Sequence, residues 1–442
     1  MQITYISHAG YLIESRSRKS RILLDPWLEG STYMDQCWLA WSYPGPIDEL
    51  LSSDILLFTH YHKDHFHPPS LSRMSKDCEV VVPTTAGSFF RDWARQTGFA
   101  KVREIGPGHS FRLGDFEIHS VRIADHWEFL DETAYLIVDG DQAALFLADL
   151  WYLPEAVVRS ACAGFHVCFA AVTWGGELQD LFVLPDGFRL DSLEEYYRYG
   201  WDEATLSRKN AINEYTPYLH LAKHLKADCL VPGSLSFGWI HPNEDRVKPL
   251  PMCRWLGQEQ YIENLPDPEL RGKSHPMYPG DRFDPERGFY RANGSSRPNT
   301  PVTQAMRCLA NSRKGTGIEL DGEAVSARFL DKISARIAEL RDASSLYGDP
   351  LSGILQASRQ IEFQIVNEAR QVFLFEQDGA RYRMREIDAP SGARDIVFIP
   401  PSVMTALVTE WGPCWTEAEM CTLVKVSATG WEPYLILKQL FR

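Results

Sequence analysis

The sequence lacks paired cysteines and any long apolar run. Its nine cysteines are scattered, and no two stand in a Cys-x-x-Cys pattern. Scattered cysteines are typical of free thiols in a reducing cytoplasm, which is where we expect this protein. No apolar stretch is long enough to span a bilayer, and residues 1–6 lack the basic region and apolar core of a signal peptide. We therefore expect no membrane partner.

Positive charge is also scarce. The 45 lysines and arginines are outnumbered by 59 aspartates and glutamates, which gives a formal net charge of −14. A protein that binds nucleic acid usually carries a basic track that meets the phosphates, and the sequence has none. We therefore expect a small-molecule substrate and no nucleic acid.

Short apolar runs alternate with helical ones in the first part of the chain. Runs at 3–6, 11–13, 21–24, 55–58, 80–82, 116–123, 134–138, 143–147 and 229–231 predict strands, and 68–74 and 207–225 predict helices. Asp139-Gly140-Asp141 predicts a tight hairpin turn, because glycine adopts the positive φ that such a turn needs. Strands with helices between and after them indicate an α/β sandwich.

The composition changes between residues 266 and 300, where periodicity vanishes and Pro, Gly, Asn and Arg dominate. We interpret 1–265 as one domain, 266–300 as a linker or long loop, and 301–442 as a smaller α+β C-terminal domain. In the last domain Val325, Phe329, Ile333, Ile337 and Leu340 predict a helix with one apolar stripe. A strand at 361–365 and a hairpin joining 371–375 to 381–384 follow it.

The most informative feature is the run Thr59-His60-Tyr61-His62-Lys63-Asp64-His65, which directly follows an apolar strand. Imidazole nitrogens and carboxylate oxygens are ligands that zinc, iron and manganese favour. A loop can turn His60 and His62 towards one point and leave Asp64 and His65 to face a second one. This spacing indicates two metal ions.

A dinuclear site needs more ligands than one loop provides. Three further residues, His126, Asp149 and His241, each follow an expected strand. Strand ends at one sheet edge converge, so these side chains are expected to meet the histidine-rich loop. Glu128 and Asp131 lie close to His126 and could replace it.

This order resembles the metallo-β-lactamase fold superfamily over roughly the first 250 residues. The segments His8-Ala9-Gly10-Tyr11-Leu12-Ile13-Glu14 and Leu24-Asp25-Pro26-Trp27-Leu28 are similar to it as well. The resemblance implies an αββα sandwich with two metal ions at its edge.

The family pattern also implies a role for each ligand. His60, His62 and His126 would hold one metal, and Asp64, His65 and His241 the other. Asp149 would bridge the ions, and Asp64 and Asp149 would act in catalysis. Ser234 leaves the assignment of His241 open, because it falls nearer to the last histidine position of simpler hydrolases.

A closer resemblance is to the metallo-β-lactamase-like domain of the CMP-N-acetylneuraminate hydroxylase family. It rests on residues 25–28, Trp38 and Trp41, residues 210–225, and the segment from Val231 to Asp245. That family adds a Rieske iron–sulfur domain, which needs Cys-x-His and Cys-x-x-His. No cysteine in this sequence is followed by histidine at either spacing, so we expect a relative without that cluster.

Other histidines have simpler interpretations. A buried, hydrogen-bonded imidazole explains His8 at least as well as a ligand does. His67 is expected to be a supporting or surface residue. His220 and His224 share one face of the expected helix, which we take as solvated because no third ligand is in view.

Three functions are compatible with these residues. The first is an oxygenase with two irons that hydroxylates or oxidises a small molecule and takes electrons from a separate ferredoxin or flavoprotein. The second is a hydrolase of a lactone or phosphodiester, in which the metals activate water. The third is a metal-binding module without catalysis. We favour the first because of the closer resemblance, with iron as the metal and zinc or manganese as alternatives. The C-terminal Trp411 and Trp415 could close the active site or form a homodimer.

Overall fold

The computed structural model divides the chain into two compact units. The first comprises Met1–Gly176, Asn210–Ile240 and Pro249–Leu309, and the second comprises Glu177–Lys209, His241–Lys248 and Ala310–Arg442. The structure describes residues 1–32, 37–39, 43–84, 89–121, 132–149, 155–173, 183–184, 222–233, 237–239, 258–263, 265–292, 327–335, 337–338, 360–365, 371–378, 381–392, 395–399 and 425–427. The predicted domain boundaries at 265 and 301 stay predictions.

One sheet of the first unit is mixed. Its described strands are, in spatial order, β18 (Gly288–Tyr290), β17 (Arg282–Asp284), β1 (Gln2–Ser7), β2 (Gly10–Glu14), β3 (Arg21–Leu24), β6 (Ile55–Leu57), β7 (Glu79–Pro83) and β8 (Lys101–Ile105). β3, β6, β7 and β8 run parallel to one another. β3 and β6 therefore end at the same edge of the sheet. That edge carries the histidine-rich loop.

The second sheet has the described order β15 (Cys229–Gly233), β13 (His166–Thr173), β12 (Gln142–Phe146), β11 (Tyr135–Asp139), β10 (Phe116–Ser120) and β9 (Ser110–Leu113). β11 and β12 form the predicted hairpin, in which Gly140 has a φ of +67°. β12 and β13 are parallel. A small sheet joins β4 (Ser31–Thr32), β5 (Cys37–Leu39) and β16 (Phe237–Trp239).

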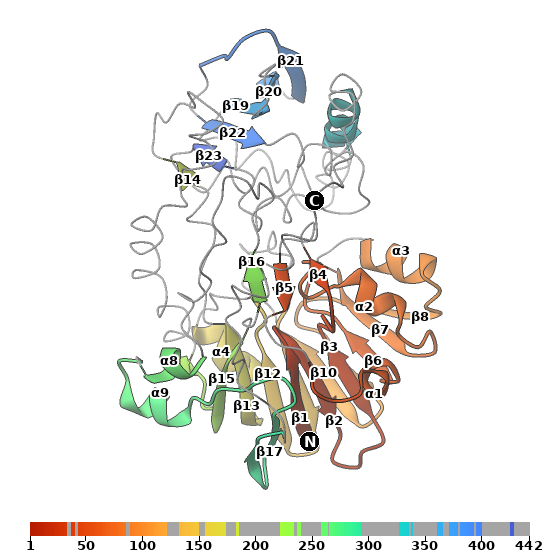
Figure 1. The fold of residues 1–442 in the computed structure, drawn as a ribbon, viewed down its shortest axis with the longest axis vertical. Helices are drawn as coiled ribbons and strands as arrows, with labels where there is room; N and C mark the ends of the chain where they lie inside the picture. Colours follow the sequence, from red (N-terminus) through yellow and green to blue (C-terminus); the bar gives the residue numbers. More distant parts are fainter. Residues whose placement is uncertain are drawn as a thin grey trace. The chain divides into compact units, whose positions relative to one another are not determined.

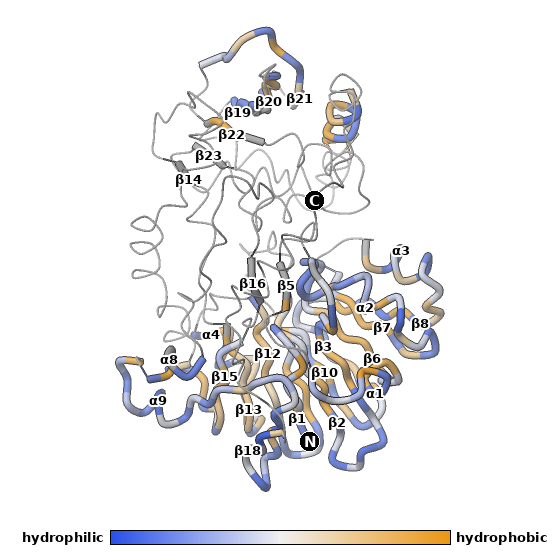
Figure 2. Tube along the Cα trace, in the orientation of Figure 1, coloured by the Kyte–Doolittle hydropathy of each residue, from blue (hydrophilic) through white to orange (hydrophobic). Residues whose placement is uncertain are grey.

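The two sheets face each other across a shared core. Alternate residues of each strand point to opposite faces, so Ile3 and Ile137 enter the core between the sheets. Leu12 and Leu136 point to the outer faces, which are also buried. Figure 2 shows that apolar residues run along these strands, and polar residues gather in the turns and helices. Both faces of each sheet therefore need a cover.

Helices provide that cover on each outer face (Figure 1). α1 (Ile47–Leu51), α2 (Pro68–Ser72) and α3 (Phe89–Gln96) contribute Leu50, Leu71 and Phe90 to the core outside the first sheet. α4 (Glu155–Ala161), α8 (Gln258–Glu263) and α9 (Pro268–Lys273) cover the second sheet. The predicted αββα sandwich is confirmed. No helix in the described ranges has the length and apolar character needed to cross a membrane.

The segment expected to be a linker or long loop contains regular structure. Its described part includes α9, β17 and β18, and β17 pairs with β1 at the edge of the first sheet. Asp267 caps α9 by accepting from the backbone amides of Glu269 and Leu270. Phe283 on β17 is buried, and its ring centroid lies 5.3 Å from that of Phe169. These residues belong to the core of the first unit.

The second unit contains a sheet of its own. Its described order is β14 (Val183–Leu184), β23 (Lys425–Ser427), β22 (Asp395–Ile399), β19 (Gln360–Ile365), β20 (Val372–Asp378) and β21 (Arg381–Ile387). The predicted hairpin is formed by β20 and β21. A helical stretch at 327–335 buries Phe329 and Ile333, and the Phe329 ring centroid lies 5.3 Å from that of Phe373. The predicted smaller α+β architecture is confirmed.

Candidate metal centre

The loop between β6 and α2 forms the centre of the candidate site. The ring centroids of Phe58 and Phe66, one at each end of the loop, lie 5.2 Å apart. The backbone amides of His65 and Phe66 both donate to the carbonyl of His62, at 2.9 and 2.7 Å, which closes the loop into a turn. His60, His62 and His65 are at most 6% exposed. The fold therefore holds three imidazoles close together and away from water.

Asp149 approaches these imidazoles from the end of β12. Its Oδ2 atom lies 3.2 Å from Nε2 of His65 and 3.6 Å from Nε2 of His60. The same oxygen lies 4.0 Å from Nδ1 of His62. The preceding residue, Ala148, has a φ of +49°, a left-handed conformation that turns the chain where the strand ends. One carboxylate oxygen thus faces three imidazoles.

Asp64 forms a second group around His65. Its Oδ2 atom lies 3.7 Å from Nε2 of His65 and 2.8 Å from Nε2 of His8. Potential ligand atoms of these three residues all lie within 4.8 Å of one another, and all three residues are buried. His8 comes from the turn between β1 and β2. His65 is therefore shared between a group that contains Asp149 and a group that contains Asp64.

Glu132 forms a third group with His60 and His62. Potential ligand atoms of the three residues lie within 4.8 Å of one another. Glu132 is 6% exposed and precedes β11. The next backbone amide, that of Thr133, donates to the carbonyl of Thr59 at 3.0 Å. This bond ties the segment that carries Glu132 to the start of the histidine-rich loop.

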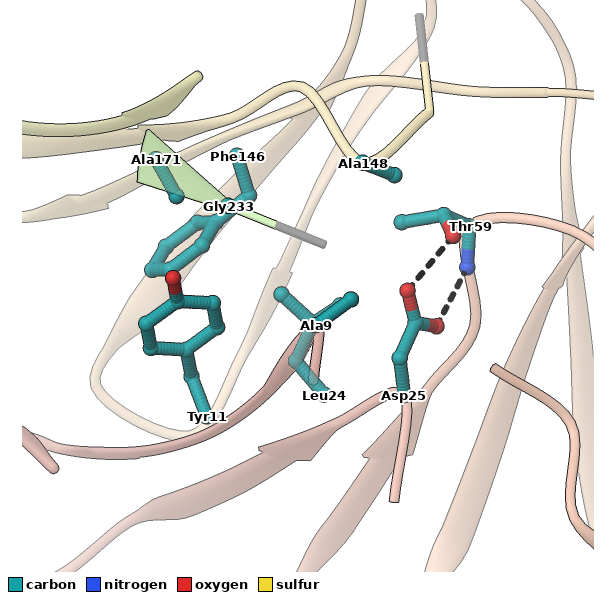
Figure 3. Close-up of a pocket in the computed structure, with 9 residues that line it drawn as sticks. All are labelled: Ala9, Tyr11, Leu24, Asp25, Thr59, Phe146, Ala148, Ala171 and Gly233. Carbon is teal, nitrogen blue, oxygen red and sulfur yellow. Dashed lines mark hydrogen bonds between the residues drawn. The ribbon is translucent and has the colours of Figure 1, made fainter. Parts of the chain in front are cut away.

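Asp25 and Thr59 orient two of the imidazoles. Asp25 accepts from the backbone amide of Thr59 at 2.9 Å and from its hydroxyl at 2.6 Å, as Figure 3 shows. Its Oδ2 atom is also hydrogen-bonded to Nδ1 of His65 at 2.8 Å. Thr59 Oγ1 lies 3.0 Å from Nδ1 of His60 and can accept a hydrogen bond from it. These contacts direct the Nε2 atoms of His60 and His65 towards the cluster.

The pKa values of His60 and His65 are shifted in opposite directions. Burial, with repulsion from His62 and His65, lowers the pKa of His60 well below its usual value, so this ring stays neutral. Burial opposes protonation of His65 as well, but Asp149 and Asp64 outweigh it and raise the pKa of His65 well above its usual value. For Asp149, burial is outweighed by His65 and His60, and its pKa falls well below the usual range. The carboxylate is therefore ionised.

A small pocket lies beside the residues that support the cluster. Asp25 and Thr59 form its polar wall, and Figure 3 shows the ring of Tyr11 on its other side next to Phe146. Tyr11 is 2% exposed, and its hydroxyl has no hydrogen-bond partner among the residues that the structure describes. The remaining lining residues are Ala9, Leu24, Ala148, Ala171 and Gly233. Apolar surroundings of this kind strengthen the nearby hydrogen bonds of Asp25.

The structure brings five of the predicted site residues together. They are His60, His62, Asp64, His65 and Asp149. The other two, His126 and His241, lie outside the described residues, as do Glu128, Asp131, Ser234 and His220. Of the histidines with simpler interpretations, His67 is buried and caps α2 by accepting from the amide of Ser70. His224 lies 3.5 Å from a carboxylate oxygen of Glu155.

Three residues of the cluster and its support had no assigned role. Glu132 stands in the sequence beside Asp131, and no pattern in the sequence singled it out, whereas the structure places it next to His60 and His62. His8 and Asp25 belong to segments that carried the resemblance. Both are buried at turns that begin or end core strands, and both have left-handed φ values, of 41° and 42°.

Comparisons with known proteins support the fold. Residues 20–180 match the family model described as "Beta-lactamase superfamily domain". A UPF0173 protein of Pyrococcus furiosus is 30% identical over 154 residues, which cover 35% of this chain and 62% of that protein. The cytidine monophosphate-N-acetylneuraminic acid hydroxylase of Danio rerio is 33% identical over 92 residues, which cover 20% of this chain and 15% of that protein. The chain spans less than two thirds of the length of either relative.

Two solved structures match part of this chain at low sequence identity. The diiron β-hydroxylase CmlA of Streptomyces venezuelae matches with a TM-score of 0.36 and 20% identity, over 53% of this chain and 44% of that one. An isothiocyanate hydrolase from Delia radicum gut bacteria matches with a TM-score of 0.41 and 15% identity, over 64% of this chain and 98% of that one. The αββα layers and the histidine-rich loop agree with the family model that residues 20–180 match.

Proposed function

We propose that the cluster is a dinuclear metal centre and that the protein is a metalloenzyme. The observation that carries this proposal is the position of Asp149, whose Oδ2 atom lies within 4.0 Å of imidazole nitrogens of His60, His62 and His65. A carboxylate can offer one oxygen to each of two ions. Asp64, which also contacts His65, supplies a separate carboxylate for the second ion.

The residues fit this use. His60 is fully buried, and its Nε2 atom has no hydrogen-bond partner within the described ranges. A buried ring nitrogen without a partner is costly, and a bound cation removes that cost. The Nδ1 side of the ring faces Thr59, so the lone pair of Nε2 is directed at the cluster. Burial also keeps the pKa of His60 low, which leaves that lone pair available.

We assign His60, His62 and Glu132 to the first ion and Asp64 and His65 to the second, with Asp149 as the bridge. Glu132 takes the position that the sequence pattern gave to His126. The roles of His126 and His241 stay predictions.

We further propose that the two ions are iron and that the reaction is the hydroxylation or oxidation of a small molecule. The donors of the assigned set are three imidazoles and three carboxylates, with no thiolate, a set that suits iron. Such ions would supply the redox chemistry that transfers oxygen to a C–H or N–H bond. One oxygen atom of dioxygen enters the product, and the other leaves as water. The two electrons this requires would come from a separate ferredoxin or flavoprotein.

Residues of the chain prepare the centre for this chemistry. Asp25 fixes the ring of His65, and Thr59 fixes that of His60, so neither imidazole has to reorient when a cation binds. The low pKa of Asp149 keeps its carboxylate ionised and ready to coordinate.

Metal analysis of the full chain, purified without added metal, tests the proposal. We expect two irons per chain and an absorbance change on reduction followed by exposure to oxygen. The Asp149→Asn variant should lose the coupling between the ions, because a neutral amide bridges poorly, whereas His224→Ala should keep the metal content of the wild type. Two zinc ions, with turnover of lactones or phosphodiesters in the absence of oxygen, would support a hydrolase and overturn the oxygenase.

A further inference from the structure

We propose that His8 is a positioning residue that holds the carboxylate of Asp64 in place for the second ion. This inference rests on the proposed dinuclear function. His8 lies in the turn between β1 and β2, and Asp64 lies in the loop after β6. The contact between them therefore links the ligand loop to a part of the sheet that contributes no ligand to the assignment above.

The distance between the two side chains is short enough for a donor to reach an acceptor. Nε2 of His8 lies 2.8 Å from Oδ2 of Asp64, and both side chains are 2% exposed. An ionised carboxylate has only lone pairs to offer, so the imidazole has to carry the proton on Nε2. A proton held between these two atoms fixes one oxygen of Asp64 and restricts rotation of the whole carboxylate.

The ring of His8 is itself held on several sides. It makes edge-to-face contacts with Trp27, at 5.9 Å between ring centroids, and with His65, at 5.3 Å. Its backbone carbonyl accepts from the hydroxyl of Tyr5 at 2.9 Å. A Cβ atom at the neighbouring Gly10 would lie only 3.0 Å from the carbonyl oxygen of Ser7, so the turn is tightly packed. His8 thus has little freedom to move away from Asp64.

The turn imposes on His8 a backbone conformation that suits glycine better than histidine. Ser7 pairs with Gly10, which leaves His8 and Ala9 as the two residues of the turn, and His8 has a φ of +41°. Glycine adopts this conformation without steric cost and is the default residue for such a position. A strained residue whose side chain reaches the site points to a role for that side chain.

Cobalt(II) titration of the metal-free full chain, followed by the visible absorption of the bound ion, tests the role of His8. Three variants are compared with the wild type: His8→Leu, His8→Gln and, as a control outside the cluster, His275→Leu. We expect His8→Leu to weaken one of the two binding steps about ten- to one hundredfold and to leave the other within about threefold. Glutamine carries an amide that can donate to Asp64, so His8→Gln should keep both steps within about threefold of the wild type.

Other results of the cobalt titrations would contradict either the role of His8 or the dinuclear centre. If both binding steps of His8→Leu kept the affinity of the wild type, the positioning role would be overturned while the dinuclear centre stands. An equal loss in His8→Gln and His8→Leu would also overturn it, because a donor would then not suffice. A wild-type titration that ends at one cobalt would instead remove the dinuclear centre itself. Thermal unfolding of the metal-free proteins identifies a variant that fails to fold, and His8→Gln then decides the question.

Discussion

Single residues of the cluster have separable tasks. His60 and His65 each direct one ring nitrogen at a supporting group and the other at the cluster. Asp25 takes part in both arrangements, directly at His65 and through Thr59 at His60. The supporting residues are therefore expected to matter for metal binding although they are not assigned as ligands.

Asp25→Asn tests this expectation. An amide has a single accepting oxygen, which is uncharged, so it cannot accept both from the backbone amide of Thr59 and from Nδ1 of His65 as the two carboxylate oxygens do. We expect a roughly ten- to one hundredfold loss of metal affinity. Competition with a chelator of known affinity measures it. Asp267→Asn, at the cap of α9, is a matched control, because asparagine caps helices as well as aspartate does. Equal affinities in the two variants would contradict a role for Asp25.

The raised pKa of His65 predicts how metal binding depends on pH. Asp149, Asp64 and Asp25 hold a proton on this ring in the metal-free protein, against the effect of burial. A cation has to displace that proton, so affinity should fall as the pH drops below the pKa of His65, by about tenfold per pH unit for one proton. Chelator competition at several pH values, with calorimetry in buffers of different ionisation enthalpy, measures the proton released. A flat profile across neutral pH would contradict it.

Two buried tyrosines differ in the hydrogen bonding of their hydroxyl groups. The hydroxyl of Tyr135 donates to the carbonyl of Phe58 at 2.9 Å, whereas the hydroxyl of Tyr11 has no hydrogen-bond partner in the described part of the chain. Tyr135→Phe should lower the free energy of unfolding by about 1–2 kcal/mol, and Tyr11→Phe should leave it unchanged or raise it by up to about 1 kcal/mol. Urea unfolding followed by fluorescence measures both. A loss at Tyr11 that matches the loss at Tyr135 would indicate a hydrogen bond to Tyr11.

The two strands of the β11–β12 hairpin, which are buried on both faces, were predicted from the sequence. Residues 135–139 and 142–146 are apolar over most of their length and are joined by Asp139-Gly140-Asp141, so their strands and turn followed from the sequence. β17 and β18 were not predicted, because each has three residues and neither shows an alternation that can be recognised. β17 joins the sheet by pairing with β1, a contact between distant parts of the sequence, and β18 pairs with β17.

Glycine substitutions test the β11–β12 hairpin. Gly140 has a φ of +67°, so Gly140→Ala should lower the free energy of unfolding by about 1–2 kcal/mol. Gly272 lies in α9 with open space around its Cβ position, and Gly272→Ala should raise the free energy by about 0.5–1 kcal/mol. Denaturant unfolding of both variants gives the comparison. The same sign for both would contradict the assigned turn.

At the scale of the whole molecule, the candidate site gathers residues from five separate stretches of the first unit. The histidine-rich loop and Asp149 could be selected from the sequence, because each follows a strongly apolar strand. Glu132 could not, since several acidic residues stand near it and only the folded backbone selects one. The order of residues thus predicted the chemistry of the site, while the exact donor set depended on tertiary contacts.

Because the chain forms two compact units, we expect two separate thermal unfolding transitions. A ligand that binds the folded state stabilises the unit that holds it, by about 2.7 kcal/mol at one hundred times its dissociation constant. The assigned ligands all belong to the first unit. We expect calorimetry to resolve two transitions, of which a chelator lowers only one. A single transition would indicate that the units unfold together, and two transitions that shift equally would contradict a metal site confined to the first unit.

The left-handed residues of the first unit have a consequence for protein engineering. Among the described residues, His8, Arg18, Asp25 and Ala148 are the non-glycine positions with positive φ, and three of them are part of the cluster or border it. Glycine at such a position relieves about 1–2 kcal/mol of steric cost. A directed-evolution screen that rewards heat resistance alone will favour glycine at these three positions, and the variants it enriches will gain robustness while their metal pocket loosens.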